Sequence, residues 1–152
     1  MRFVPIPTDL ARHYRAGGAD AYGMEPERGI SDGGGNPCRH CLRMIPQGAP
    51  MLVLAHRPFP APQPYAEMGP IFLCATDCPA GGGPDVPEIL ASPDYILRGY
   101  GGDDRIVYGT GGVVATPRIA EEAALRLSDP RVAYVHVRSA RNNCFQCRID
   151  RD

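Results

Sequence analysis

The chain contains 152 residues, 43% of them hydrophobic, and its formal net charge is −1. This length is typical of one ordinary domain, and the hydrophobic fraction is sufficient for a core, which argues against global disorder. The near-zero charge argues against a general nucleic-acid or anionic-membrane surface, because phosphate binding normally shows as an excess of basic residues. No apolar run approaches the roughly 18 residues that a membrane-spanning helix requires.

Residues 1–35 are expected to form a loop-rich N-terminal segment. A short edge strand at 2–6 precedes one or two helical turns at 9–17, and turn residues without periodicity predict a loop at 23–37. The apolar patch near the start is too short for the core of a signal peptide. We therefore expect a cytoplasmic protein, in which cysteines act as thiols, ligands or catalysts before they form disulfides.

Two apolar runs in the middle of the chain predict a β-hairpin. Residues 51–59 and 70–74 are the strand candidates, and the proline-rich residues 60–70 connect them. Turn residues at 79–87 interrupt the chain after the second strand. The two strands are expected to pair in antiparallel fashion, which returns the chain to the end of the hairpin where it began.

The second half of the chain predicts further strands. Residues 88–100 combine a helical turn with a strand, and 104–116 favour two short strands around a glycine-rich turn. Residues 132–140 alternate between apolar and polar side chains as a strand does, and 144–149 form another candidate. These runs indicate a mostly antiparallel sheet.

One convincing helix is predicted at residues 116–128. Thr116 is expected to cap it, and Pro117 occupies the first helical position, where its missing N–H has no consequence. Apolar residues recur at a spacing of four and give the helix one apolar face. The predicted fold class is therefore α+β, with one main helix, in a single domain of residues 1–152.

Six cysteines form three close pairs: Cys38/Cys41, Cys74/Cys78 and Cys144/Cys147. A Cys-x-x-Cys loop directs two thiolates to one point, as tetrahedral zinc requires. The first pair immediately precedes the predicted hairpin, and the second pair begins at the end of its returning strand. The hairpin should therefore bring both pairs into one zinc-binding unit within residues 36–79.

These residues resemble the opening of treble-clef zinc fingers of the LIM and poly(ADP-ribose)-polymerase types. The run "CRHCLRMIPQG", with Ile45 and Gly48 at the expected spacing, is followed by a hairpin and then "CATDC". The resemblance implies structural zinc on Cys38, Cys41, Cys74 and Cys78, with the second pair at the start of a helix. His40, between the first two cysteines, is expected to face outward.

A longer resemblance extends from about residue 36 to the end. The motifs "PCRHCLRMI", "VLAHRPF", "PYAEMGPIFLCATDC" and "YVHVRSARNNCFQCRI" are similar to an uncharacterised bacterial family, a domain of unknown function. This resemblance implies no activity. The use of arginine for all 16 basic residues agrees with a GC-rich bacterial genome.

Other interpretations of the cysteines remain open. The first four could be core or incidental residues, or one pair could be a redox motif, although such a motif normally lies between a strand and a helix. Cys144 and Cys147 lie three apart on a predicted strand and should point to opposite faces, so burial is the simpler interpretation. Alternatively, Cys144 is a reactive thiol beside Arg141 and near His136.

The strand at 132–140 places Tyr134, His136 and Arg138 on one face. A solvent-facing strand produces this pattern without any function. The alternative is the floor of a pocket that binds a carboxylate or phosphate through an arginine, with Arg141 also available. Residues of the hairpin could complete that pocket: His56, Arg57, Tyr65 and Glu67.

We expect a binding or interaction module with a structural zinc, since a zinc with four thiolate ligands keeps no open position for catalysis. A protein or a small anionic ligand would be its partner. The first alternative is a small enzyme or anion-binding protein that uses His136, Arg138, Arg141 and Cys144, with Cys144 and His136 as the catalytic candidates. The second is nucleic-acid binding by the zinc-finger-like unit, which needs a surface patch of Arg39, Arg43 and Arg57.

Overall fold

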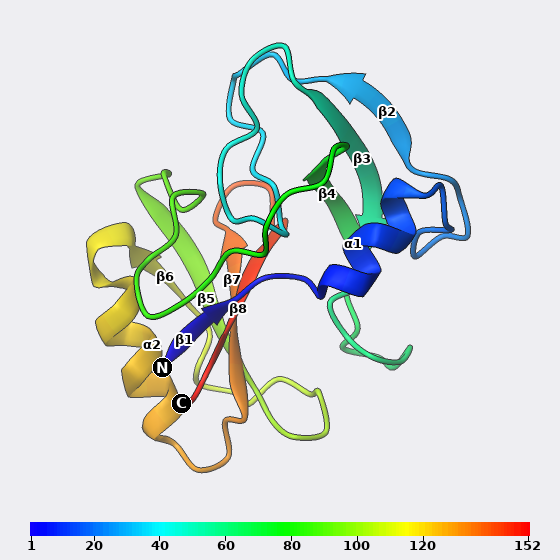
Figure 1. Ribbon diagram of the computed structural model, residues 1–152. Helices are drawn as coiled ribbons and strands as arrows, with labels where there is room; N and C mark the ends of the chain where they lie inside the picture. Colours follow the sequence, from blue (N-terminus) through cyan, green and yellow to red (C-terminus); the bar gives the residue numbers. More distant parts are fainter.

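Eight strands form two antiparallel sheets in the computed structural model, which describes residues 1–152 (Figure 1). The larger sheet has the order β1-β8-β7-β5-β6, with bounds β1 Arg2–Val4, β5 Asp94–Tyr100, β6 Gly112–Ala115, β7 Tyr134–Ser139 and β8 Phe145–Asp150. The smaller sheet has the order β2-β3-β4, with bounds β2 Glu27–Ile30, β3 Pro50–His56 and β4 Gly69–Cys74. The predicted α+β class, with mostly antiparallel sheet and one main helix, is confirmed.

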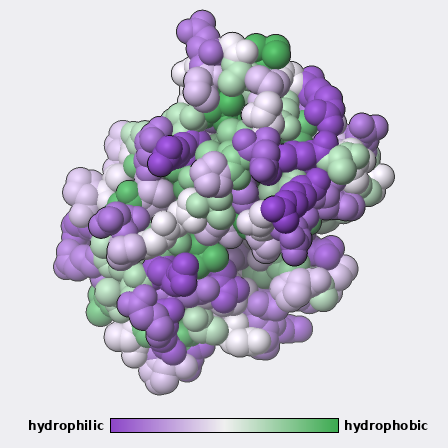
Figure 2. Space-filling view, in the orientation of Figure 1, coloured by the Kyte–Doolittle hydropathy of each residue, from purple (hydrophilic) through white to green (hydrophobic).

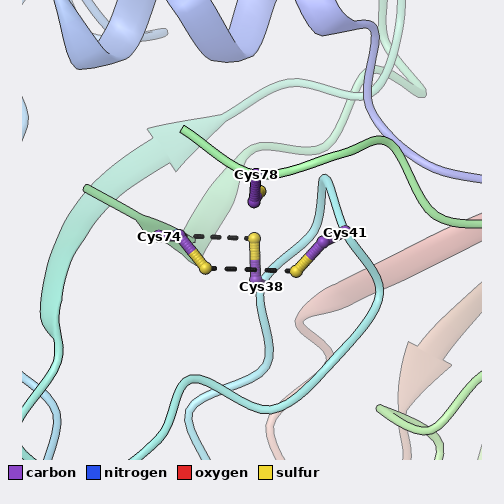
Figure 3. Close-up of side chains that lie close together, drawn as sticks. All are labelled: Cys38, Cys41, Cys74 and Cys78. Atoms are coloured by element: carbon purple, nitrogen blue, oxygen red, sulfur yellow. Dashed lines mark hydrogen bonds between the residues drawn. The ribbon is translucent and has the colours of Figure 1, made fainter. Parts of the chain in front are cut away.

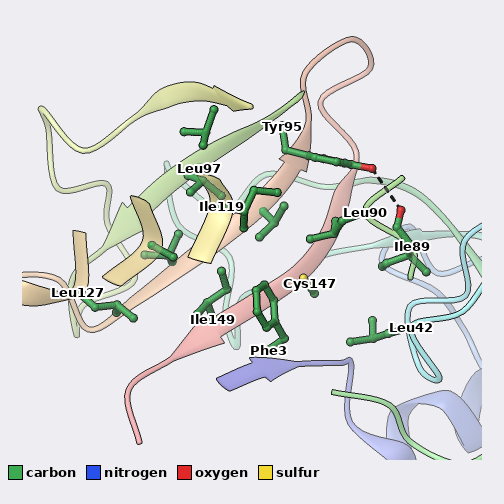
Figure 4. Close-up of a cluster of buried hydrophobic side chains, with 14 of the residues drawn as sticks. Phe3, Leu42, Ile89, Leu90, Tyr95, Leu97, Ile119, Leu127, Cys147 and Ile149 are labelled. Atoms are coloured by element: carbon green, nitrogen blue, oxygen red, sulfur yellow. Dashed lines mark hydrogen bonds between the residues drawn. The ribbon is translucent and has the colours of Figure 1, made fainter. Parts of the chain in front are cut away.

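The main helix covers one face of the larger sheet. A 3₁₀ turn, η1 (Thr116–Arg118), leads into α2 (Ile119–Ser128). Ile119 and Leu127 point from α2 towards Leu97 and Ile149 of the sheet, and Figure 4 shows these side chains meeting in one cluster. Burial of this apolar face removes it from water and holds the helix on the sheet.

The smaller sheet has its own core beneath the short helix α1 (Thr8–Arg15). Ala11 and Tyr14 of α1 pack with buried residues of β3 and β4. In Figure 1 the chain between β1 and α1 runs from the larger sheet to the smaller one. The first residues of the chain therefore join the two sheets, and β1 is an edge strand as the sequence predicts.

The predicted hairpin of β3 and β4 is confirmed. The two strands pair in antiparallel register, with Met51 opposite Cys74 and His56 opposite Gly69. This register places the end of β4 beside the start of β3. The last residue of the returning strand thus lies next to the chain that contains the first cysteine pair.

Three local predictions are wrong. Residues 27–30 of the predicted loop pair with β3 and form the edge strand β2. Only one strand forms within 104–116, because the first part meets β5 through a single bridge between Tyr100 and Ile106. Thr116 does not cap the main helix, since its hydroxyl donates to the Ser92 carbonyl and Thr116 is itself the first residue of the 3₁₀ turn η1.

The surface mixes polar and apolar residues. Figure 2 shows hydrophilic residues across one face of the molecule, with smaller hydrophobic areas between them. No helix combines the length and apolar character that a membrane-spanning helix needs.

Candidate metal centre

Four cysteines converge where the smaller sheet meets the chain that precedes it. The ligand atoms of Cys38, Cys41, Cys74 and Cys78 all lie within 4.8 Å of one another. Figure 3 shows them approaching from three segments: the turn before β3, the end of β4, and the loop after β4. The two pairs predicted to share one site are therefore brought together, and the cluster can hold a metal ion.

The spacing of the sulfurs agrees with tetrahedral metal coordination. Four thiolates about 2.3 Å from a zinc ion lie about 3.8 Å apart along the edges of the tetrahedron. The Cys41 and Cys74 Sγ atoms are 4.0 Å apart. All four cysteines are unbridged thiols, so the full donor set is present.

The backbone of the first pair is a tight turn. The amide of Leu42 donates to the Cys38 carbonyl over 3.0 Å, and Leu42 adopts a positive φ of 55°. The amide of Cys74 donates to the Cys38 sulfur over 3.3 Å, as backbone amides do towards metal thiolates. This turn fixes the direction of the first two side chains before any metal binds.

The loop after Cys78 passes very close to that turn. A Cβ at Gly81 would lie 2.1 Å from the Cys41 carbonyl oxygen, and a Cβ at Gly82 would lie 2.4 Å from the Phe3 carbonyl oxygen. Neither position accepts another residue without a shift of the backbone. The sequence predicts only a turn at residues 81–83. In the structure these glycines allow the close packing that brings Cys78 to the other cysteines.

Two donors converge on the sulfur of Cys78. Arg15 Nη2 lies 3.0 Å from this sulfur and His40 Nδ1 lies 3.3 Å from it. His40 Nε2 lies 3.0 Å from the Thr8 hydroxyl. In the Nδ1–H tautomer, Nδ1 donates to the sulfur and Nε2 accepts from the Thr8 hydroxyl, and Arg15 Nη2 lies 3.4 Å from the same Nδ1. Such outer contacts orient a metal ligand and reduce its charge.

All three guanidinium nitrogens of Arg15 on α1 make contacts at the cluster. Its Nε donates to the Cys74 carbonyl over 3.1 Å, and its Nη1 pairs with Asp77 over 3.0 Å. Sequence reasoning missed this residue. No local signal distinguishes Arg15 from Arg12, the exposed arginine one turn earlier on the same helix.

The thiols influence one another strongly. Hydrogen bonds from Cys41 and Cys74 lower the pKa of Cys38 far below its usual range, and the same contacts raise the pKa of both donors. Burial, with the Cys38 charge nearby, raises the pKa of Cys78 to about 12. The cluster thus favours one thiolate among neutral thiols, and a metal ion that binds all four must displace the remaining protons.

Two expectations from the zinc-finger resemblance are wrong. Cys78 is followed by irregular chain and not by a helix, and the helix that reaches the cluster is α1 from the N-terminal segment. His40 does not face outward but is fully buried, because α1 covers it. The helix beside the cluster is therefore α1, which supplies none of the four ligands.

A family model described as "Protein of unknown function (DUF1203)" matches residues 35–151. The chain belongs to this family. The match includes all four cysteines, the hairpin and both C-terminal strands, and it confirms the resemblance to an uncharacterised family. Searches of curated proteins and of solved structures returned no match.

The polar strand face of this DUF1203 chain is buried between the sheets, so the solvent-facing interpretation is wrong. His136 is 1% exposed and Arg138 is 3% exposed. Arg138 pairs with Glu67 over 3.2 Å, and the Tyr134 hydroxyl donates to Asp104 over 2.7 Å. The rings of four aromatic residues surround the His136 imidazole: Phe59, Tyr100, Tyr134 and Phe145.

The other candidates lie apart from His136, in the turn between β7 and β8. Arg141 is exposed and pairs with Asp94 over 2.9 Å. The half-buried Cys144 thiol donates to the Asn142 carbonyl over 3.6 Å. Cys147 lies in the larger core, where burial raises its pKa to about 12. Arg141 therefore lies outside the buried part of the strand, whereas the buried Arg138 reaches the same turn by donating to Asn143, the neighbour of Cys144.

The surface patch required for nucleic-acid binding is incomplete. Arg39 is 3% exposed, and its guanidinium donates to the carbonyls of Phe145 and Pro37 over 2.8 and 2.6 Å. Burial lowers its pKa to about 10. Arg39 thus links the first cysteine pair to β8 and presents no charge to a phosphate backbone.

Proposed function

We propose that Cys38, Cys41, Cys74 and Cys78 bind one Zn²⁺ ion with a structural role, and that the protein is a binding module and not a metal-dependent enzyme. The observation that carries this proposal is the mutual approach of the four thiols within 4.8 Å. Tetrahedral sites with four sulfur ligands hold zinc or iron–sulfur centres. A zinc ion with four cysteine ligands keeps no free position for water or substrate.

The surroundings of the cluster support a structural role. The cysteines come from the turn before β3, the end of β4 and the loop after β4, and the ion would fasten these three segments together. Arg15 supplies a positive charge against the net charge of −2 that four thiolates and one Zn²⁺ produce together. Six unbridged cysteines also agree with a reducing compartment, so we propose a cytoplasmic location.

Cobalt substitution tests the coordination directly. Metal-free protein, prepared with a chelator under reducing conditions, is titrated with Co²⁺ and then with Zn²⁺. We expect intense tetrahedral d–d bands and a thiolate charge-transfer band at one equivalent of cobalt, both abolished by zinc. The same spectrum should appear in Cys144→Ser, whose residue lies outside the cluster.

The Cys78→Ser variant completes the test. We expect weaker charge transfer and looser cobalt binding in it, because one thiolate is replaced by a poor ligand. A weak octahedral-type spectrum in the wild type, or identical spectra in Cys78→Ser and Cys144→Ser, would contradict the proposed site.

A further inference from the structure

A cavity of about 360 Å³ lies where the two sheets meet, away from the cysteines. Its walls come from the β1–α1 connection, the chain after β3, and strands β7 and β8. Figure 1 shows the β1–α1 connection running between the two sheets at this place. Sites for small ligands commonly have a volume of roughly 300–1,000 Å³ and lie between structural units.

Two buried histidines line this cavity from opposite sheets. His56 ends β3 and is 4% exposed, and His136 lies in the middle of β7 and is 1% exposed. Neither nitrogen of His136 has a hydrogen-bond partner in the protein, and Nδ1 of His56 has none. Buried polar groups are almost always paired, so these nitrogens indicate a partner that is not part of the chain.

A guanidinium lies beside His136 in the same wall. Arg148 on β8 is directly opposite His136 on β7, so both side chains project from the same face of the sheet. Nε of Arg148 donates to Asp150, and its guanidinium lies over the Tyr134 ring, with 3.8 Å between Cζ and the ring centroid. Its side chain is partly exposed, and its two terminal nitrogens make no hydrogen bond within the protein. Arg57 also lines the cavity, so its charged lining comprises two arginines and one aspartate.

The remaining walls are apolar. They include Ile6, Leu10, Phe59, Phe145 and four prolines. The Phe145 ring centroid lies 4.9 Å from that of His136 and 5.6 Å from that of His56, so this ring packs against both imidazoles. Aromatic rings in an apolar lining suit a planar apolar ligand.

We propose that this cavity binds a small planar monocarboxylate, with its carboxylate among Arg57, Arg148 and His136 and its apolar body against Phe59 and Phe145. Asp150 already pairs with Arg148, so Arg57 supplies the excess positive charge of the lining, and one negative charge on the ligand balances it. A guanidinium and an imidazole N–H together present the donors that a carboxylate accepts. A dianion such as phosphate would leave a charge unpaired among apolar walls. The cavity contains no cysteine, so this inference does not depend on the metal.

The experiment uses the whole protein with uniformly ¹⁵N-labelled histidine and three probes. Benzoate has the proposed charge and body, benzamide has the body without the charge, and acetate has the charge without the body. Titrations follow the ring nitrogens of His136 and His56 by NMR. We expect saturable shifts with benzoate at an affinity about tenfold higher than for benzamide or acetate.

Two variants locate the binding. Leu10→Trp places a large ring in the cavity from a half-buried position, and Leu125→Trp is its control on an exposed part of α2. Benzoate affinity should fall about tenfold in Leu10→Trp, remain unchanged in Leu125→Trp, and fall to the level of benzamide in Arg148→Gln. Absence of saturable shifts, equal affinity for benzoate and benzamide, or unchanged benzoate binding in Leu10→Trp would each overturn the proposal.

Discussion

Cys78 is the metal ligand that depends most on distant parts of the chain. The Arg15 guanidinium and the buried His40 imidazole both donate to its sulfur, and both are held by α1 or covered by it. These donors offset negative charge that four thiolates would concentrate around the ion. The affinity for zinc should therefore depend on a helix that supplies no ligand.

Replacement of Arg15 tests this dependence. In Arg15→Gln we expect the zinc affinity to fall by about tenfold, because outer contacts to metal ligands typically have effects of this size. The measurement is competition with a chelator of known affinity. Arg12→Gln is the matched control, since Arg12 lies on the same helix but is exposed and pairs only with Asp9. Equal affinities in the two variants would rule out the role of Arg15.

The buried histidines predict a loss of stability in acid. Burial, with the charges of Arg39, Arg57 and Arg138, lowers the pKa of His56 to about 4. Below the unfolded pKa of about 6.5 the unfolded chain takes up this proton and the folded chain does not, so stability falls as the pH falls. From pH 7.5 to pH 5, His56 alone should lower the unfolding free energy by about 2 kcal/mol.

Urea unfolding of the wild type and of His56→Gln measures this contribution. The variant should lose less stability than the wild type over the same pH interval, by about 2 kcal/mol. His13→Gln serves as control because His13 bonds only to the nearby Ala19 carbonyl in an exposed turn. If His56→Gln and the wild type lose stability in parallel, His56 is not a buried neutral histidine in solution.

Some residues of the metal centre could be predicted from the sequence and others could not. The cysteines were predictable because each pair is local and the hairpin between them has a clear apolar pattern. Arg15 and His40 were not, because their contacts join residues 25 or more positions apart. The burial of His136 was also not predictable, since an alternating strand has the same pattern whether its polar face meets water or a second sheet.

At the scale of elements, the main helix and the strands of the larger sheet were mostly predictable. Their apolar periodicity is strong, and Pro117 and the glycine-rich turns mark their ends. The edge strand β2 was not, although the edge strand β1 was. The side chains of strand β2 are largely exposed, and only the pairing of its backbone with β3 makes it a strand.

The packing of α2 gives a test with two matched leucines. Leu127 is buried in the larger core, whereas Leu125 on the same helix is 66% exposed. Leu127→Ala should lower the unfolding free energy by about 2–4 kcal/mol, because it removes buried contacts and leaves a cavity. Leu125→Ala should change it by less than about 0.5 kcal/mol. Thermal and urea unfolding measure both, and a similar effect of the two variants would contradict the packing.

At the scale of the whole molecule, the first cysteine pair connects the two cores. Cys38 belongs to the core of the smaller sheet and Leu42 to that of the larger one. Between them, Arg39 donates to the Phe145 carbonyl of β8 over 2.8 Å. We therefore propose that residues 1–152 form one domain, with the metal centre at the contact between its two cores.

Removal of the metal should then loosen both sheets. After treatment with a chelator, we expect backbone amides of β4 and β8 to exchange with deuterium at least about tenfold faster. Without the metal, the contact between the two cores no longer stabilises either sheet. The control is chelator already saturated with zinc. Faster exchange in β4 with unchanged exchange in β8 would show instead that the two sheets are independent units.

The most direct test of the central claim is the metal content of freshly purified protein, measured by elemental mass spectrometry with no chelator in the preparation. We expect about one zinc per chain in the wild type and in Cys144→Ser, and a large loss in Cys38→Ser and Cys78→Ser. Absence of metal from the wild type, or equal zinc in all four proteins, would contradict a zinc centre at these cysteines.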